Sequence, residues 1–255
     1  MAAVLLPAPE TLHPAVWRAH QLGRGREETV ATGFGALDAE LPGGGWPRRA
    51  LSELLLPHEG IGELRLLAPA LRQVAQAGRV VMLFDPPSPL CAPGWAQLGV
   101  PVERLLLVLP RQPLRGAARE RLPQADVLWA LEQALKSGHV GAVLAWLPAR
   151  LKAEMMRRLQ LASQAHDGPA FVLREVSAQQ RPSPAPLRLV LQPGEADALS
   201  VRLLKRRGPA LEQALRLRLP PVLPALARSR AEPSAGETAG VPAVPLAPQP
   251  SAVLR

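Results

Sequence analysis

The chain has 255 residues, of which 47% are hydrophobic, with a formal net charge of +9 and a single cysteine, Cys91. One cysteine excludes an internal disulfide and a thiolate metal cluster, and the lack of an uninterrupted apolar run of about 18 residues excludes a membrane-spanning helix. We therefore expect a cytoplasmic protein of one or two domains that has no membrane partner.

The positive charge is concentrated in the C-terminal part of the expected globular region. Residues 1–149 carry 14 Lys or Arg and 13 Asp or Glu, a net charge of +1, whereas residues 150–218 carry 13 and 6, a net charge of +7. A basic surface attracts polyanions, of which nucleic acid is the commonest in a cytoplasm. A merely solvated, arginine-rich surface would give the same count.

The composition divides the chain into three segments. Residues 1–28 form a leader in which Pro14 can open a docking or packing helix. Residues 29–219 have the apolar content of a folded core. Residues 220–255 contain eight prolines, and this composition offers too little apolar surface to offset the entropy of ordering. They predict a disordered Pro/Ala-rich tail.

Within the core, short apolar runs alternate with amphipathic stretches, which predicts an α/β fold with a mostly parallel sheet flanked by helices. Pro69 should kink the first helix or delay its start. Two apolar runs around the turn sequence PGEADA predict a C-terminal hairpin. The expected elements are a strand at 50–56, a helix from Gly62, strands at 78–85 and 104–110, a helix at 126–138, a strand at 139–147, a helix at 151–165, a strand at 170–176, and hairpin strands at 187–192 and 199–205.

The loop LPHEGIGEL (56–64) lies between the first strand and the first helix, where an open parallel sheet binds anions. In the phosphate-binding pattern G-x-x-x-x-G-K-[ST], glycines wrap the phosphates, the lysine reaches them and the hydroxyl ligates Mg²⁺. Here Pro57 replaces the first glycine, Glu63 the lysine and Leu64 the hydroxyl, and a carboxylate in that place would repel phosphate by several kcal/mol. The degenerate nucleotide loop consists of Pro57, Gly60, Gly62, Glu63 and Leu64.

These residues carry a family resemblance. The run ATGFGALDAELPGGGWPRRALSELLLPHEGIGEL (31–64) resembles the entry to the core of RecA recombinases, and LFDPPSPL, QLGVPVERLLLVLP and AVLAWL follow in the order of RecA's elements. In addition, LHPAVWRAHQLG, LPHEGIGEL, SPAPLRLVL and VRLLKRRGP are similar to the ImuA family, RecA-like and SulA-like accessory proteins of bacterial damage-induced mutagenesis. This resemblance covers roughly residues 10–219.

Two further positions depart from RecA. Trp146 stands where the metal-coordinating aspartate would end a strand, and Pro87 or a neighbour stands where the water-activating glutamate would lie. Asp85 is the nearest acid, and it is more typical of a cap or turn. Because phosphoryl transfer needs a cation on the phosphates, a held metal and an oriented nucleophile, we expect no enzymatic activity, no cofactor and no metal.

The resemblance to ImuA implies a non-catalytic scaffold for translesion DNA synthesis in the SOS response. It implies an ImuB-like Y-family polymerase protein and an error-prone replicative-type polymerase as partners, RecA and single-stranded DNA as further candidates, and nucleoid association after damage. Two alternatives stay open, a SulA-like inhibitor of the cell-division protein FtsZ and a diverged DNA-dependent ATPase.

The segment VRLLKRRGP (201–209) offers a candidate binding surface. If alternate residues from Leu199 face the core of an edge strand, Arg202 points outward and basic residues continue beyond the strand end. RecA-like proteins place DNA-binding loops between late strands, which implies that the connection VSAQQRPSPAPLR contributes as well. Few aromatic residues are available to stack on bases, so contacts would be mainly with phosphates.

The alternative is that these basic residues bind no partner, and that Arg206 and Arg207 only cover the strand end and pair with Glu212 or Asp197. The candidate DNA-binding or partner-binding residues are Arg181, Arg188, Arg202, Lys205, Arg206 and Arg207.

Overall fold

The computed structural model describes residues 28–109, 124–208, 211 and 213–221. The predicted leader, except Glu28, and the predicted tail, except Pro220 and Pro221, lie outside these residues. Within the described ranges, no helix has the length and apolar character needed to span a bilayer.

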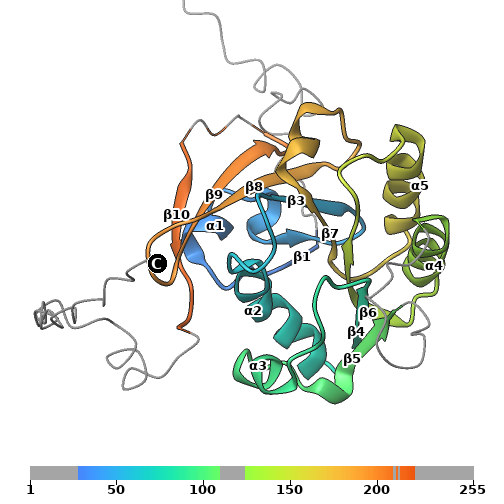
Figure 1. Ribbon diagram of the computed structural model, residues 1–255, viewed down its shortest axis with the longest axis horizontal. Coiled ribbons are helices and arrows are strands. Elements are labelled where there is room, and N and C mark those ends of the chain that lie inside the picture. Colours follow the sequence, from blue (N-terminus) through green and yellow to red (C-terminus); the bar gives the residue numbers. More distant parts are fainter. Residues whose placement is uncertain (1–27, 110–123, 209–210, 212, 222–255) are drawn as a thin grey trace, which may run out of the picture. The chain divides into compact units, whose positions relative to one another are not determined.

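An eight-stranded sheet forms the centre of the fold (Figure 1). Its strands are β3 (Leu51–Leu56), β4 (Val80–Phe84), β5 (Leu105–Val108), β6 (Val140–Trp146), β7 (Ala170–Glu175), β8 (Leu187–Pro193), β9 (Ala198–Lys205) and β10 (Leu215–Arg218). Their order is β10-β9-β8-β3-β7-β6-β4-β5. The pairs from β8 to β5 are parallel, whereas β9 pairs antiparallel with both β8 and β10. The predicted α/β class, the mostly parallel sheet and the hairpin of β8 and β9 are confirmed.

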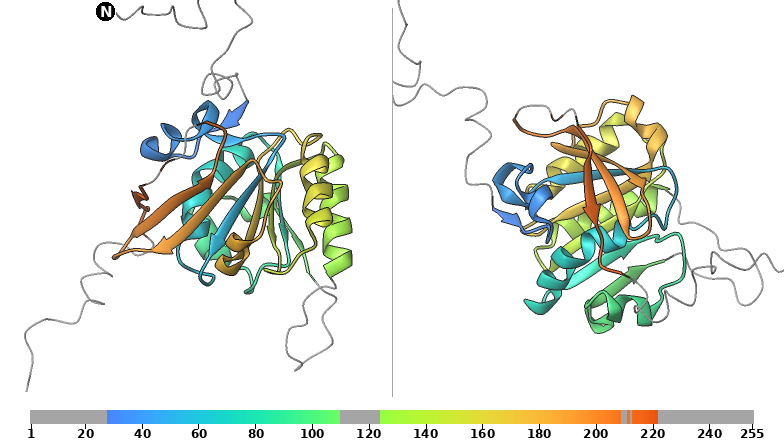
Figure 2. Two further views of the ribbon diagram at one scale, coloured as in Figure 1. Left: turned by 90° about the horizontal axis from the view of Figure 1, so that it is seen from above. Right: turned by 90° about the vertical axis from the view of Figure 1, so that its left-hand side faces the viewer.

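Helices cover both faces of this sheet (Figure 2). The longer ones are α2 (Glu63–Gln76) on one face and α4 (Gln124–Lys136) and α5 (Ala153–Ser163) on the other. The shorter elements are α1 (Gly35–Asp38), α3 (Ala92–Gln97), the 3-10 helices η3 (Pro42–Gly44), η4 (Val102–Arg104) and η5 (Val176–Gln180), and a small antiparallel sheet of β1 (Thr29–Val30) and β2 (Trp46–Pro47).

The central strands are buried on both faces, as expected of strands between two helical layers. In β6, Leu144 and Trp146 belong to the α2 side of the core, whereas Val143 and Ala145 belong to the α4 and α5 side. This alternation explains why the central strands appear in the sequence as nearly continuous apolar runs.

Two local expectations need correction. Of the two effects expected of Pro69, the delayed start is wrong, because α2 begins at Glu63 and continues through Pro69 to Gln76, whereas the kink stays a prediction. The ring packs against Gly33, where an added Cβ would lie 2.4 Å from the Pro69 Cβ. The strand at 199–205 is not an edge strand either, because β10, which was not predicted, lies outside it.

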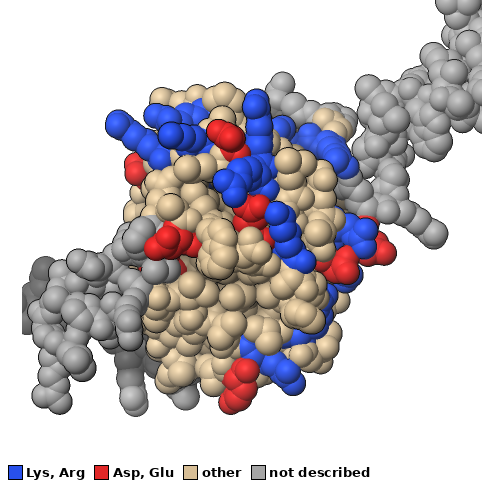
Figure 3. All heavy atoms as spheres, turned by 90° about the vertical axis from the view of Figure 1, so that its right-hand side faces the viewer, with Lys and Arg blue, Asp and Glu red and all other residues tan. Residues whose placement is uncertain are grey.

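The α4 and α5 surface carries charges of both signs. Glu132 forms ion pairs with Lys136 on its own helix and with Arg158 on α5, each at 2.6 Å. Trp129 and Leu161 are each 64% exposed on the same two helices. Figure 3 shows this side of the molecule, where Lys and Arg gather with Asp and Glu over one part and a broad area is uncharged.

Candidate functional site

The degenerate nucleotide loop connects β3 to α2, and its two glycines have left-handed backbone conformations. The φ angle is +84° at Gly60 and +110° at Gly62. Such angles favour glycine, so the loop keeps the backbone path of a tight turn before a helix N-terminus.

The Glu63 side chain occupies the anion-binding position of this loop. One carboxylate oxygen, Oε1, accepts a hydrogen bond from the Gly60 N–H at 2.8 Å, and Oε2 accepts one from the Gly62 N–H at 3.1 Å. Glu63 is only 3% exposed and is the first residue of α2, where a negative charge is favoured by the helix dipole. The loop therefore folds around a carboxylate of its own chain, which accepts from backbone N–H groups of the kind that bind phosphate in nucleotide-binding loops.

A second contact covers the same loop from the C-terminal end of the fold. A Cβ at Gly62 would lie 2.5 Å from the Leu219 Cδ1, and Leu219 is buried. Arg65, in the first turn of α2, holds this end in place by donating to the Pro220 carbonyl from Nε at 2.9 Å and to Asp197 Oδ1 from Nη2 at 2.5 Å. The segment after β10 is thereby fastened beside the degenerate nucleotide loop.

A pocket of about 400 Å³ lies at the carboxyl ends of β3, β6 and β7. Its wall includes Pro57, His58 and Glu59 of the loop and Trp146 at the end of β6. The Trp146 indole Nε1–H is buried without a hydrogen-bond partner among the described residues. The residue in the place of the metal-binding aspartate is therefore a buried indole, which offers no oxygen ligand to a metal.

Asp85 follows β4 directly in a left-handed conformation, with φ of +47°, and is 4% exposed. Its backbone N–H donates to the Val108 carbonyl at 3.0 Å. This geometry is that of a residue that turns the chain at a strand end.

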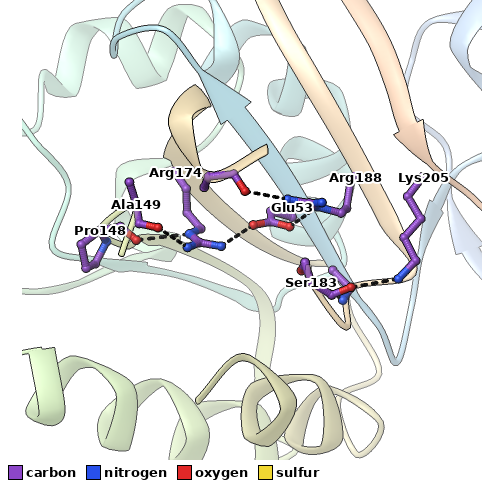
Figure 4. Close-up of polar contacts among 9 residues, drawn as sticks. Glu53, Pro148, Ala149, Arg174, Ser183, Arg188 and Lys205 are labelled. Carbon is purple, nitrogen blue, oxygen red and sulfur yellow. Dashed lines mark hydrogen bonds and ion pairs between the residues drawn. The ribbon is translucent and has the colours of Figure 1, made fainter. Parts of the chain in front are cut away.

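Glu53 on β3 forms a buried ion triad with Arg174 on β7 and Arg188 on β8 (Figure 4). Glu53 Oε1 accepts from Arg174 Nη1 at 2.5 Å, and Oε2 accepts from Arg188 Nε at 2.6 Å. The three residues are 0%, 4% and 7% exposed.

The remaining donors of the triad hold two backbone segments. Arg174 donates to the Pro148 and Ala149 carbonyls at 3.2 and 2.6 Å, and Arg188 donates to the Ala178 carbonyl at 3.1 Å. The segment after β6 and the η5 segment after β7 are therefore tied to the middle of the sheet. Charged residues inside the apolar runs ALSELLL and AFVLREV were the sequence signal for this triad, because a buried charge needs a partner.

The structure separates the six predicted basic residues. Arg188 lies in the triad and does not contribute to an exposed surface. Arg206 is directed to the other side of β9, where its Nη1 donates to the Glu40 Oε2 at 2.7 Å with the side chain 13% exposed. Asp197, one of the two acids expected beside Arg206 and Arg207, forms an ion pair with Arg65, and position 212 lies outside the described residues.

The other four predicted basic residues are exposed: Arg181, Arg202, Lys205 and Arg207. Arg202 Nη2 donates to Gln179 Oε1 at 3.3 Å, and Lys205 Nζ donates to the Ser183 carbonyl at 2.9 Å. Arg207 lies beyond the end of β9, in the wall of a pocket of about 520 Å³ that Arg48 and Arg49 also line.

Comparison with known proteins gives two groups of relatives. The family described as cell division inhibitor SulA matches residues 51–171, just under half of the chain. Cell division inhibitor SulA of Pectobacterium atrosepticum is 32% identical over 113 residues, which are 44% of this chain and 61% of that protein. Protein RecA of Synechococcus sp. (strain CC9605) is 30% identical over 155 residues, which are 57% of this chain and 41% of RecA.

The chain thus spans about three fifths of the length of these SulA relatives and about two fifths of the RecA relatives. The SulA match begins at β3 and ends at the start of β7, so η5 and the strands β8, β9 and β10 lie beyond it. The chain is similar to both SulA and RecA, and the match to the SulA family spans the degenerate nucleotide loop.

Proposed function

We propose that this chain is a non-catalytic RecA-like and SulA-like accessory protein of the DNA damage response that works without a nucleotide. The observation that carries the proposal is the position of the Glu63 carboxylate on the N–H groups of Gly60 and Gly62. A phosphate would have to displace this buried carboxylate, and neither a lysine nor a hydroxyl follows Gly62 to compensate.

The specific role we propose is that of a scaffold of the ImuA type in translesion DNA synthesis and mutagenesis. Its partners would be an ImuB-like Y-family polymerase protein and an error-prone replicative-type polymerase, with association at the nucleoid after damage. Similarity to both SulA and RecA supports this role, as do the four ImuA-like sequence segments.

A second candidate function is the inhibition of cell division. It is favoured by the match to the SulA family over residues 51–171. The match leaves out β8 to β10, which form the basic end of the sheet, so a whole-protein activity of the SulA kind is a separate proposal.

Calorimetric titration with ATP and Mg²⁺ tests the common basis of both candidates. We expect no binding, and Glu63→Lys alone should not restore hydrolysis because the hydroxyl and the metal ligand would still be missing. Micromolar ATP binding by the unaltered chain would contradict the proposal and would favour the diverged ATPase.

Assays with two purified proteins, an ImuB-like Y-family protein and FtsZ, distinguish the two candidate functions. Co-elution of the chain with an ImuB-like Y-family protein in size-exclusion chromatography supports the scaffold role. Inhibition of FtsZ polymerisation, followed by sedimentation, supports the inhibitor role. A chain that forms no complex with the Y-family protein but blocks FtsZ would overturn the scaffold assignment.

A further inference from the structure

The sheet face that holds the buried triad is covered unequally from one end to the other. On this face α4 packs on β6 and α5 on β3, and a second small cluster places Ala178 of η5 against Leu55 and Val190. Farther along, β9 and β10 form the end of the sheet opposite β4 and β5 (Figure 1).

Successive side chains of a strand point to opposite faces of the sheet, which determines the side chains of β9 and β10 that lie on this face. Leu199, Val201 and Leu203 of β9 and Leu217 of β10 are buried in the core on the α2 side. The intervening residues therefore point to the other face, where Arg216 lies opposite Ser200 in the register and Arg202 lies opposite Val190. All the arginines among these outward residues are exposed.

Five basic side chains gather along these strands and the adjoining η5 segment, and we name them the β9–β10 strip. Arg202 and Lys205 reach back over β8 to Gln179 and Ser183, which places them beside the η5 segment. The members of the strip are Arg181, Arg202, Lys205, Arg216 and Arg218.

Acidic residues do little to neutralise the β9–β10 strip. Glu195 pairs with Arg216 at 3.1 Å, but both side chains are mostly exposed, at 83% and 67%, and such pairs contribute little. Asp197 lies nearby but is held by Arg65. The β9–β10 strip therefore keeps a strong local excess of positive charge.

We propose that the β9–β10 strip binds the phosphate backbone of single-stranded nucleic acid. The outward residues of a strand repeat every two residues, about 6.7 Å apart, and neighbouring strands lie about 4.8 Å apart, so the strip is long and narrow enough for one backbone. Arginine pairs well with phosphate because its planar fork donates two hydrogen bonds. The members of the β9–β10 strip are all basic, so the contacts are with phosphates, which carry no sequence information, and recognition is independent of sequence.

The proposal adds Arg216 and Arg218 to the predicted binding residues and removes Arg188, Arg206 and Arg207. It does not depend on the accessory role or on the absence of ATP binding, because it rests on the charge and exposure of another part of the fold. Failure of one proposal is therefore distinguishable from failure of the other.

Fluorescence anisotropy with a labelled oligothymidine of about 16 nucleotides tests the proposal on the full chain. The variant Arg202→Ala/Arg216→Ala/Arg218→Ala should bind about tenfold or more weakly at low salt, and the salt dependence of log K should become shallower by about 0.7 for each phosphate that the variant no longer neutralises. The matched control is Arg150→Ala/Lys152→Ala/Arg157→Ala, which removes the same charge from exposed positions before and on α5. It should change the affinity by less than about threefold.

Melting temperatures of both variants check that the fold is intact, and replacement of the three strip arginines by lysine should keep most of the affinity. Equal losses of affinity in the two alanine variants would overturn the proposal, since binding would then follow net charge alone. Lack of oligothymidine binding by the unaltered chain at about 50 mM salt would also overturn it. Tighter binding of a duplex of the same length would overturn the assignment to single strands, and binding of only an acidic polypeptide would reassign the strip to a protein partner.

Discussion

The Glu63 carboxylate accepts the hydrogen bonds of the loop N–H groups, so these donors already have a partner within the chain. If the carboxylate is removed, the N–H groups of Gly60 and Gly62 lose their acceptor, and the loop must be hydrated or reorganised. We predict that Glu63→Ala lowers the free energy of unfolding by about 1 to 2 kcal/mol. Urea unfolding measures this change, and Glu154→Ala in the exposed first turn of α5 is the matched control.

The same variant should expose the anion-binding character of the loop. Millimolar inorganic phosphate should raise the melting temperature of Glu63→Ala more than that of the unaltered chain, because a ligand that binds only the folded state stabilises it. An equal effect of phosphate on both proteins would show that the loop has no latent affinity for anions.

His166 is a buried histidine in the connection from α5 to β7. Burial, aided by the charge of Arg79, lowers its pKa from 6.5 to about 4. A histidine whose pKa is lower in the folded state stabilises the fold above pH 6.5 and loses that contribution as the pH falls towards 4. Between pH 7 and pH 5 the loss should be about 2 kcal/mol.

Chemical unfolding at both pH values measures this contribution. His166→Leu should remove most of the pH-dependent loss, whereas His139→Leu, at an exposed position, should keep it. An unchanged pH dependence in His166→Leu would contradict the assignment to His166.

The triad of Glu53, Arg174 and Arg188 connects β3, β7 and β8. Removing one partner leaves a buried charge without compensation, so Glu53→Ala should cost about 3 to 5 kcal/mol in unfolding free energy. The triple variant Glu53→Leu/Arg174→Met/Arg188→Met should recover most of that loss because no charge remains buried. Thermal unfolding of both variants tests the expectation, and a triple variant no more stable than Glu53→Ala would show that the hydrogen bonds to the backbone dominate.

The strands and longer helices could be predicted from the sequence because each carries its own periodic apolar pattern. The strand β10 was missed because four residues, LRLR, are too short a pattern to separate from a loop, and α3 was missed because APGWAQ contains Pro and Gly. At the site, the spacing could predict that Glu63 stands in the place of the lysine of a phosphate-binding loop, but it could not predict the contacts of its carboxylate with Gly60 and Gly62. Arg188 was misplaced because alternation along one strand cannot reveal which charges face it from β3 and β7.

At the scale of the whole molecule, the last residues of the described fold contribute to its packing. Leu219 is buried against Gly62, and the Pro220 carbonyl accepts hydrogen bonds from Arg65. A truncation that leaves these contacts intact should differ sharply from one that removes them, although the two chains differ by only three residues.

We therefore predict that a chain ending at Pro221 keeps the melting temperature of the full chain, because the residues beyond it have the composition of a segment that does not add to a core. A chain ending at Arg218 should melt several degrees lower, because it loses one buried leucine and the backbone carbonyl acceptors of Arg65, a cost of about 2 to 4 kcal/mol. Differential scanning calorimetry compares the two truncations, and Leu219→Ala in the full chain isolates the packing contribution. A large loss of stability already at the Pro221 truncation would show that the proline-rich segment packs on the fold, and equal stability of both truncations would show that the degenerate nucleotide loop does not need its cover.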